Sequence, residues 1–265
     1  MQLGILGIGN MGGAILSGVL SHGVLQPGQI QIFDLNAEKV QEVCRNLGVS
    51  PAASLPEMAA TCDMLLLAVK PNVIEAVLSE HRDCFAGKGV ISIIAGWNQA
   101  RLAAHLPDST RILRVMPNMP AMAGAGMTVL EKGDTLTPQE HAFAASLFTA
   151  IGEVSAVEPK LMDAVTAVSG SGPAYVCLFI EAMADGGVQA GLPRSIAYQL
   201  AAQTVLGTAK MMQDTGAHPA ELKDRVCSPA GTTIDAVEAL EKDGFRYAVI
   251  DAVKTCYEKS RSMGK

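Results

Sequence analysis

The sequence predicts an α/β fold in which an N-terminal, doubly wound parallel sheet is followed by an all-helical C-terminal domain. In the first half, short apolar runs alternate with amphipathic stretches, as in successive strand–helix–strand units. From about Leu161 onward there are long helical stretches and no convincing strand pattern. With 49% hydrophobic and 17% charged residues, the composition is that of a globular protein.

The elements of the first half follow from the spacing of their apolar residues. Continuous apolar runs bounded by polar residues indicate strands that are buried on both faces. We expect such strands at Leu3–Leu6, Ile30–Phe33, Met64–Val69, Val90–Ile94 and Ile112–Val115. Helical patterns lie between them at Met11–Ser21, Ala37–Leu47 and Val73–Ser79. Right-handed crossovers then place the carboxyl ends of all these strands along one edge of the sheet.

Glycine and proline divide the second half into helices. We expect these at Pro173–Gly186, Pro193–Thr215, Pro219–Val226, Thr233–Lys242 and Arg246–Ser262. Pro193 and Pro219 suit first-turn positions, and Gly216 and Gly244 suit positions just past a helix end. Several of these helices are apolar on more than one face, which indicates burial against a partner subunit.

The boundary between the two halves is expected near Val157–Lys160. It divides the chain into a dinucleotide-binding domain, residues 1–158, and a helical domain for dimerisation and substrate binding, residues 159–265.

Composition argues against several kinds of protein. The net charge is −6 and there is no basic cluster, so nucleic-acid binding is not expected. Glycine, proline or charge interrupts every long apolar stretch, so no membrane span is expected, and the N-terminus is interpreted as a strand, not a signal peptide. The six cysteines and five histidines show no metal-ligand spacing, which predicts free thiols in a cytosolic protein without a metal.

The most informative motif in the first half is Gly7-Ile8-Gly9-Asn10-Met11-Gly12. It fits G-x-G-x-x-G, follows an expected strand and opens an expected helix. The first glycine permits a tight turn, the second lets the backbone approach a pyrophosphate, and the third allows close contact between helix and strand. A bare match often marks only a tight turn, but this context predicts a Rossmann-like dinucleotide site.

Asp34 closes the second expected strand, 22 residues past Gly12, where an acidic residue binds the ribose hydroxyls of a dinucleotide. A carboxylate there repels a 2′-phosphate, and only Asn36 and Lys39 are nearby, so the residues favour NADH. The alternative is that Asp34 merely caps the next helix.

The most informative motif in the second half runs from Cys227 to Asp235. A turn of small residues leads into a helix start, where free N–H groups and the helix dipole favour an anion such as a substrate carboxylate. Ser228, Thr232 and Thr233 add hydroxyl donors. The alternative is an ordinary capping box formed by Thr232 and Asp235.

Two further segments leave alternatives open. Lys70, at the end of the expected strand Met64–Val69, suits a phosphate or substrate contact as well as a solvated strand end. Ser169–Tyr175 lacks the pattern of a nucleophile elbow, and its glycines are interpreted as allowing close helix crossing.

Together these segments resemble the pyrroline-5-carboxylate reductase family over nearly the whole chain. The resemblance rests on Gly7–Gly12, Ala68–Pro71, Met116–Asn118, Ser169–Tyr175 and His218–Leu240. It implies reduction of 1-pyrroline-5-carboxylate to L-proline by hydride from NADPH or NADH. It also implies dimers formed through the C-terminal helices. In the family, five such dimers commonly make a decamer.

The resemblance also implies roles for individual residues. Thr233 is the candidate catalytic residue, as a hydrogen-bond donor to the ring nitrogen. The implied cofactor-binding residues are Gly7, Ile8, Gly9, Asn10, Met11, Gly12, Asp34, Asn36, Ala68, Val69, Lys70, Pro71 and Ala95. The implied substrate-binding residues are Ser228, Gly231, Thr232, Thr233 and Asn118.

The chain departs from the family pattern at three positions. Ala230 replaces a common glycine in the substrate loop, and alanine costs stability if that position needs a positive φ. Met119 stands where threonine is common. Asp34 replaces a small polar residue, which leaves open whether NADH or NADPH is preferred.

Two other functions remain as alternatives at this stage. A β-hydroxyacid dehydrogenase would use a lysine on the first long C-terminal helix, but no lysine occurs between Pro173 and Ala190. A non-enzymatic dinucleotide sensor is supported only by the capping interpretation of Thr232 and Asp235.

Overall fold

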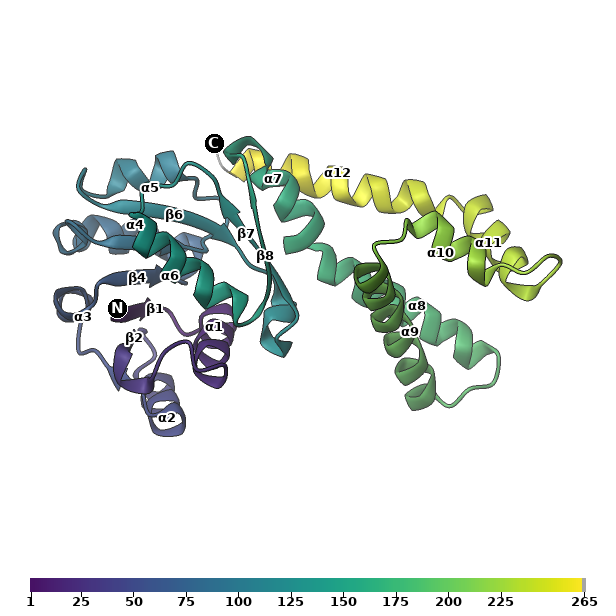
Figure 1. Ribbon diagram of the computed structural model, residues 1–265, viewed down its shortest axis with the longest axis horizontal. Coiled ribbons are helices and arrows are strands. Elements are labelled where there is room, and N and C mark those ends of the chain that lie inside the picture. Colours follow the sequence, from purple (N-terminus) through teal and green to yellow (C-terminus); the bar gives the residue numbers. More distant parts are fainter. Residues whose placement is uncertain (264–265) are drawn as a thin grey trace. The chain divides into compact units, whose positions relative to one another are not determined.

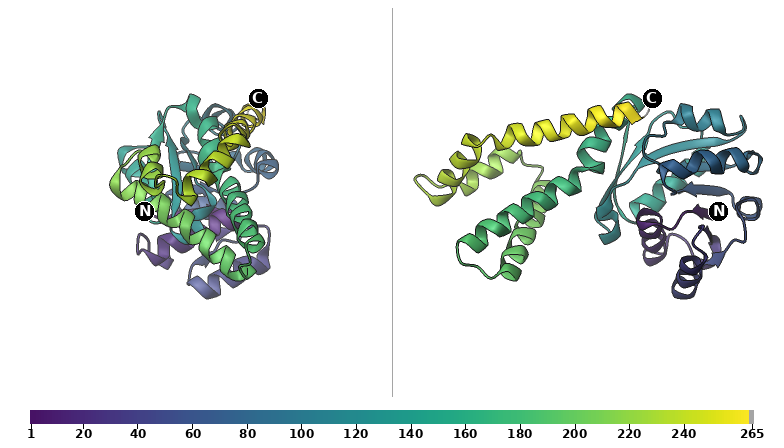
Figure 2. Two further views of the ribbon diagram at one scale, coloured as in Figure 1. Left: turned by 90° about the vertical axis from the view of Figure 1, so that its right-hand side faces the viewer. Right: turned by 180° about the vertical axis from the view of Figure 1, so that it is seen from behind.

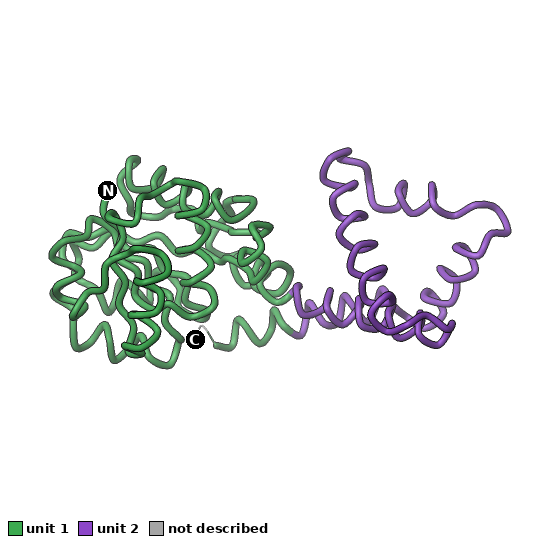
Figure 3. The backbone as a smooth tube through the Cα atoms, turned by 90° about the horizontal axis from the view of Figure 1, so that it is seen from below, with its two compact units in different colours: residues 1–171, 256–265 green, residues 172–255 purple. Residues whose placement is uncertain are grey.

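The computed structural model describes residues 1–263, which form two compact units (Figure 3). Unit 1 comprises Met1–Ser171 and the end of the chain from Cys256, and unit 2 comprises Gly172–Thr255. The division at Gly172 follows the contacts of the chain, whereas the expected boundary near residue 158 coincides with the end of the last strand. The domain boundary itself stays a prediction.

Unit 1 contains an eight-stranded sheet in the order β3-β2-β1-β4-β5-β6-β7-β8 (Figure 1). The strands are β1 (Leu3–Leu6), β2 (Ile30–Phe33), β3 (Ser50–Pro51), β4 (Met64–Leu67), β5 (Gly89–Ser92), β6 (Arg111–Met116), β7 (Gly126–Glu131) and β8 (Gly152–Val157). All neighbours are parallel except β6 and β7, which pair antiparallel with Val115 opposite Leu130. The doubly wound parallel sheet is therefore confirmed, and the chain adds two strands of reversed direction at one edge.

Alternate residues of the central strands enter two different cores, as a sheet covered on both faces requires. Leu66 of β4 packs with α1 (Asn10–Ser21), α2 (Ala37–Leu47) and α6 (Pro138–Thr149), whereas Leu67 packs with the helices of the opposite face. The helices of that face are α3 (Leu55–Thr61), α4 (Pro71–Glu80) and α5 (Gln99–His105).

An ion pair between the half-buried Arg111 and the buried Glu140 joins β6 to α6. Arg111 Nε donates to Glu140 Oε2 at 2.8 Å, while Glu140 also accepts from the backbone and hydroxyl of Thr137, the N-cap of α6. Arg111 first, and then Thr137, lower the pKa of the buried Glu140 carboxyl to about 2, against the raising effect of burial.

We expect Glu140→Gln to lower the free energy of unfolding near neutral pH by about 3 kcal/mol, because each pKa unit corresponds to about 1.4 kcal/mol. A carboxyl whose pKa is lower in the folded state stabilises above its unfolded pKa, near 4.5, and loses that contribution as pH falls toward 2. Urea unfolding of the wild type between pH 7 and pH 3 should show this loss, and Glu140→Gln should flatten it. An equal effect of Glu42→Gln, at an exposed position, would contradict the assignment.

Unit 2 is helical, as expected. It contains α8 (Gly172–Gln189), α9 (Arg194–Thr215), α10 (Pro219–Val226), α11 (Thr232–Lys242) and most of α12 (Phe245–Met263). Helices α8 and α9 lie side by side as a hairpin, with Ala184, Ala197 and Ala201 buried between them (Figure 2). Pro219 occupies the first turn of α10 as expected, whereas Pro193 is the N-cap of α9, one position before the helix.

Unit 2 exposes many large apolar side chains. Leu178, Leu206, Tyr247 and Ile250 are 59–71% exposed in the single chain. By length and composition alone, the helical stretch Pro159–Gln189 is apolar enough to cross a membrane, although interface helices have the same character. The expectation that the protein has no membrane span stays a prediction.

The glycines of Ser169–Tyr175 do not bring helices of the described chain together. Added Cβ atoms would meet nothing nearer than 3.8 Å at Gly170 and nothing within 4 Å at Gly172. The expectation of close helix crossing at these glycines is therefore wrong for the single chain.

Candidate dinucleotide and carboxylate sites

The Gly7–Gly12 turn connects β1 to α1 and depends on glycine at two places. Gly7 has φ +96°, and a Cβ there would lie 2.8 Å from the carbonyl oxygen of Ala68. A Cβ on Gly12 would lie 2.1 Å from the carbonyl oxygen of Gly7. The first and third glycines therefore have the steric roles that the motif predicts: a tight turn and close contact of helix with strand.

The second glycine faces open space. A Cβ on Gly9 would meet no described atom within 4 Å, so packing within the chain does not require glycine here. Gly9 is also the N-cap of α1, and no side chain caps that helix. The start of α1 therefore offers free N–H groups and the positive end of the helix at an exposed stretch of backbone. This arrangement fits the pyrophosphate of a dinucleotide.

The Asp34 side chain is hydrogen-bonded directly to this turn. Its Oδ2 accepts from the backbone N–H of Ile8 at 2.9 Å, and its Oδ1 accepts from the N–H of Asn36 at 3.0 Å. Asn36 itself caps α2, because its side chain accepts from the N–H of Lys39 at 3.0 Å. The alternative that Asp34 merely caps the next helix is therefore wrong, and the carboxylate instead connects the end of β2 to the glycine turn.

A cavity of about 670 Å³ opens beside the turn. Six of the predicted cofactor-binding residues line it: Gly7, Gly9, Asp34, Ala68, Val69 and Lys70. Its wall also includes apolar residues that the motif did not indicate, namely Phe33, Leu35, Leu55, Val73 and Val77. Leu35, directly after Asp34, is 84% exposed, and sequence periodicity offers no signal for this apolar wall.

The other predicted cofactor residues lie around this cavity and do not line it. Ile8 is buried, and Asn10, Met11 and Gly12 form the first turn of α1. Pro71 is the first residue of α4, whose N-cap Lys70 makes no side-chain cap, so a second helix start is open at this edge. Ala95 is exposed after β5, where that strand leaves the sheet.

Asn118 is held at both ends of its amide. Its Oδ1 accepts from the N–H of Met127 at 2.8 Å, and its Nδ2 donates to the carbonyl oxygen of Ser169 at 3.1 Å. Ser169 lies in a π-helical turn, Thr166–Gly170, and its hydroxyl is buried without a hydrogen-bond partner in the described chain. π-Turns are frequent at functional sites, and sequence periodicity gives no signal for them.

The Ser228–Thr233 loop of unit 2 is a tight turn between α10 and α11. The N–H of Gly231 donates to the carbonyl oxygen of Ser228 at 3.0 Å, and Ala230 has φ +56°. The sequence predicts that alanine at position 230 costs stability if a positive φ is needed there, and the structure shows such a φ, so this alanine is strained. A Cβ on Gly231 would lie 2.2 Å from Ser228 Oγ and 3.1 Å from the Ser228 carbonyl oxygen, so a larger residue would require the Ser228 side chain to rotate.

The start of α11 carries no side-chain cap. Its N-cap is Gly231, and Thr232 is already the first helical residue. The capping-box alternative for Thr232 and Asp235 is therefore wrong. The first N–H groups of an eleven-residue helix remain available, with the Thr233 hydroxyl half-buried beside them and Ser228 exposed. This arrangement suits a carboxylate.

No group of three or more potential metal ligands gathers in residues 1–263.

Two family models match the chain. Pyrroline-5-carboxylate reductase dimerisation matches residues 159–263, and NADP oxidoreductase coenzyme F420-dependent matches residues 2–96.

Full-length relatives give the same assignment. The pyrroline-5-carboxylate reductases of Escherichia coli (strain K12) and Synechocystis are 44% and 46% identical, each over 100% of this chain and 98% and 99% of theirs. A crystal structure of the Plasmodium falciparum enzyme with NADP bound is 32% identical, with a TM-score of 0.90 over 100% of this chain and 98% of that one. The Coxiella burnetii enzyme is 31% identical, with a TM-score of 0.92 at the same coverage. The chain belongs to the pyrroline-5-carboxylate reductase family.

Proposed function

We propose that this protein reduces 1-pyrroline-5-carboxylate to L-proline, the final step of proline biosynthesis, with NADH or NADPH as hydride donor. The observation that carries the proposal is the uncapped start of α11 beside the Ser228–Thr233 loop, together with the accessible glycine turn of unit 1. The first suits the substrate carboxylate and the second suits the cofactor pyrophosphate.

The reaction needs two electrons and two hydrogens at one C=N bond. A bound, reduced nicotinamide would supply the hydride to the imine carbon, and the ring nitrogen would take a proton from solvent. In our proposal, Ser228, Gly231 and Thr232 hold the carboxylate, and the Thr233 hydroxyl donates a hydrogen bond at the ring nitrogen. A hydrogen bond donated to this nitrogen would polarise the C=N bond and stabilise the negative charge that develops on nitrogen as the carbon accepts hydride. Binding cofactor and substrate next to each other would supply most of the rate.

Residues of unit 1 are proposed to orient the cofactor. The N–H groups of Asn10 and Met11 at the start of α1 would hold the pyrophosphate, with the Lys70 ammonium as a cationic contact. Leu35 and Val73 offer an apolar surface for the adenine ring. Asn118 is proposed to act indirectly, since both ends of its amide are bonded to backbone groups, by holding the Ser169 turn in place.

Asp34 is proposed to disfavour a 2′-phosphate. Its carboxylate lies on the wall of the dinucleotide cavity and is fixed by two backbone N–H groups, so it cannot turn away without breaking them. A phosphate next to a fixed carboxylate is repelled, whereas ribose hydroxyls donate to it.

The steady-state rate with pyrroline-5-carboxylate and either NADH or NADPH tests both the reaction and the role of Asp34. We expect turnover by the wild type, and Asp34→Ser should raise the ratio of kcat/KM for NADPH to that for NADH about tenfold or more. Asp34→Asn, which removes the charge and keeps the shape, should shift the ratio in the same direction. Lack of turnover with both cofactors would refute the reaction, and an unchanged ratio would refute the role of Asp34.

The helical half is proposed to form a homodimer, and dimers to assemble further into a decamer. The exposed apolar side chains of α8, α9 and α12 support an interface, and the matching family model is one of dimerisation. Sedimentation equilibrium would give the number of subunits. We also propose a cytosolic location, because the six cysteines of the described chain are free thiols, as is usual in a reducing compartment.

A further inference from the structure

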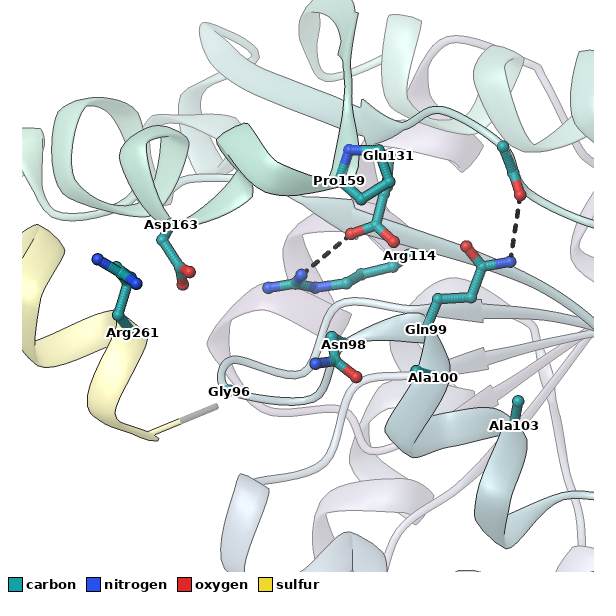
Figure 4. Close-up of a pocket in the computed structure, with 11 residues that line it drawn as sticks. Gly96, Asn98, Gln99, Ala100, Ala103, Arg114, Glu131, Pro159, Asp163 and Arg261 are labelled. Atoms are coloured by element: carbon teal, nitrogen blue, oxygen red, sulfur yellow. Dashed lines mark hydrogen bonds and ion pairs between the residues drawn. The ribbon is translucent and has the colours of Figure 1, made fainter. Parts of the chain in front are cut away.

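Unit 1 contains a second cavity, of about 560 Å³, that shares no lining residue with the dinucleotide cavity (Figure 4). It lies between β6, β7 and the start of α5 on one side and Asp163 and Arg261 on the other. Its volume is typical of sites for small molecules. The proposed reaction uses none of its residues.

The floor of this cavity is a buried charged pair. Arg114 of β6 and Glu131 of β7 have side chains only 7% and 3% exposed, and Arg114 Nη1 donates to Glu131 Oε2 at 3.0 Å. This hydrogen bond uses one of the five N–H donors of the guanidinium, and the buried Nε has no hydrogen-bond partner in the described chain. Figure 4 shows the guanidinium extending toward the side of the cavity where Asp163 and Arg261 lie. A buried guanidinium with donors left over favours binding of a further carboxylate.

The opposite wall carries one further charge of each sign. Asp163 Oδ1 accepts from the Ser260 hydroxyl at 2.7 Å, and no ion pair in the described chain neutralises this carboxylate. Arg261 is exposed, has no carboxylate within ion-pairing distance among residues 1–263, and lies with its guanidinium 5.6 Å from the ring centre of Tyr257. The cavity therefore presents two cations and two anions, with a net charge near zero.

The amides at the start of α5 provide neutral partners. Asn98 Oδ1 accepts from the N–H of Arg101 at 2.8 Å, which leaves the Asn98 amide hydrogens for a ligand. Gln99 Nε2 is directed at the carbonyl oxygens of Ile112 and Gly133, at 3.5 and 3.4 Å, which leaves Gln99 Oε1 as an acceptor. Donors and acceptors thus line the same cavity.

We propose that this cavity binds a zwitterionic α-amino acid, distinct from the catalytic site. Its carboxylate would lie between Arg114 and Arg261, and its ammonium group would donate to Asp163. A zwitterion matches walls that carry both signs, whereas a phosphate would face the carboxylates of Glu131 and Asp163. Ala100, Ala103 and Pro159 leave an apolar space that suits a small aliphatic side chain.

The test is calorimetric titration of the full-length protein with each standard L-amino acid. We expect at least one to bind with a Kd below about 10 mM, at one site per chain. Its N-acetyl and carboxamide derivatives, which each lose one charge, should bind about tenfold more weakly or not at all. Failure of every amino acid to bind would overturn the proposal.

Three variants locate the binding. Arg261→Gln, at an exposed position that does not threaten folding, should weaken binding about tenfold. Lys259→Gln removes a neighbouring exposed cation of α12 that does not line the cavity, and it should leave the Kd unchanged. Thr233→Ala should also leave it unchanged. Binding that is lost in Thr233→Ala and kept in Arg261→Gln would belong to the proposed substrate loop and would overturn the second site.

Discussion

Thr233→Ala is expected to lower kcat/KM for pyrroline-5-carboxylate about 100-fold or more, with little effect on the binding of NADH. A positioned proton donor contributes about 10²–10⁴-fold, and the Thr233 hydroxyl is the half-buried donor at the start of α11. Because no side chain caps α11, the change removes no capping bond, and the free energy of unfolding should stay within about 0.5 kcal/mol of the wild type. Steady-state kinetics together with urea unfolding measure both quantities.

Two substitutions at the same position separate the hydroxyl from the shape. Thr233→Ser keeps the donor and should recover most of the activity, whereas Thr233→Val keeps the branched shape and should behave like alanine. A fall in kcat with unchanged KM would indicate a role in the transition state, and a rise in KM alone would indicate ground-state binding. Full activity of the valine variant would refute any role for the hydroxyl.

The sequence predicted the strands β1, β2, β4, β5 and β6, because each contains closely spaced apolar residues bounded by polar ones. The bounds of β1 and β2 agree with the structure to the residue. The strands β3, β7 and β8, and the helices α3, α5 and α6, were not predicted. α6 has apolar residues around its whole circumference, so it lacks the 3.6-residue period that identifies a helix. β8 has no continuous apolar run, although half-buried and exposed residues alternate along most of it.

The candidate site was predictable where backbone chemistry dictates residue type. The glycines of the turn and Asp34 belong to this class, since a close backbone approach excludes every other residue at Gly12. Hydrogen-bond partners were not predictable, because they depend on tertiary contacts. Sequence left Asp34 and Thr232 each with a capping alternative, and only the observed caps, Asn36 and Gly231, exclude both. The cavity at Arg114 joins β6 to residues about 150 positions later, which no local pattern reveals.

Gly12→Ala is expected to weaken dinucleotide binding about 100-fold. The added Cβ would lie 2.1 Å from the Gly7 carbonyl oxygen and 3.2 Å from the Ala68 Cβ, and the nearer of these is a backbone atom that cannot turn aside. The start of α1 must then move away from β1, which separates the N–H groups that would hold the pyrophosphate. Overpacking of this kind costs about 1–3 kcal/mol, so the melting temperature of the cofactor-free protein should fall as well. Fluorescence titration with NADH and calorimetry measure the two effects.

Gly13→Ala, one residue further along the same helix, is the matched control. Its Cβ would meet only the Ile8 carbonyl oxygen, at 3.8 Å, which is ordinary contact. Both substitutions gain the same helix propensity, about 0.5–1 kcal/mol for alanine over glycine, so their difference isolates the close approach at Gly12. We expect Gly13→Ala to bind NADH normally and to melt slightly higher than the wild type. If both variants bound NADH equally well, contact between α1 and the Gly7 carbonyl would not be what shapes the phosphate site, and helix position would have to be set by the Asp34–Ile8 bond instead.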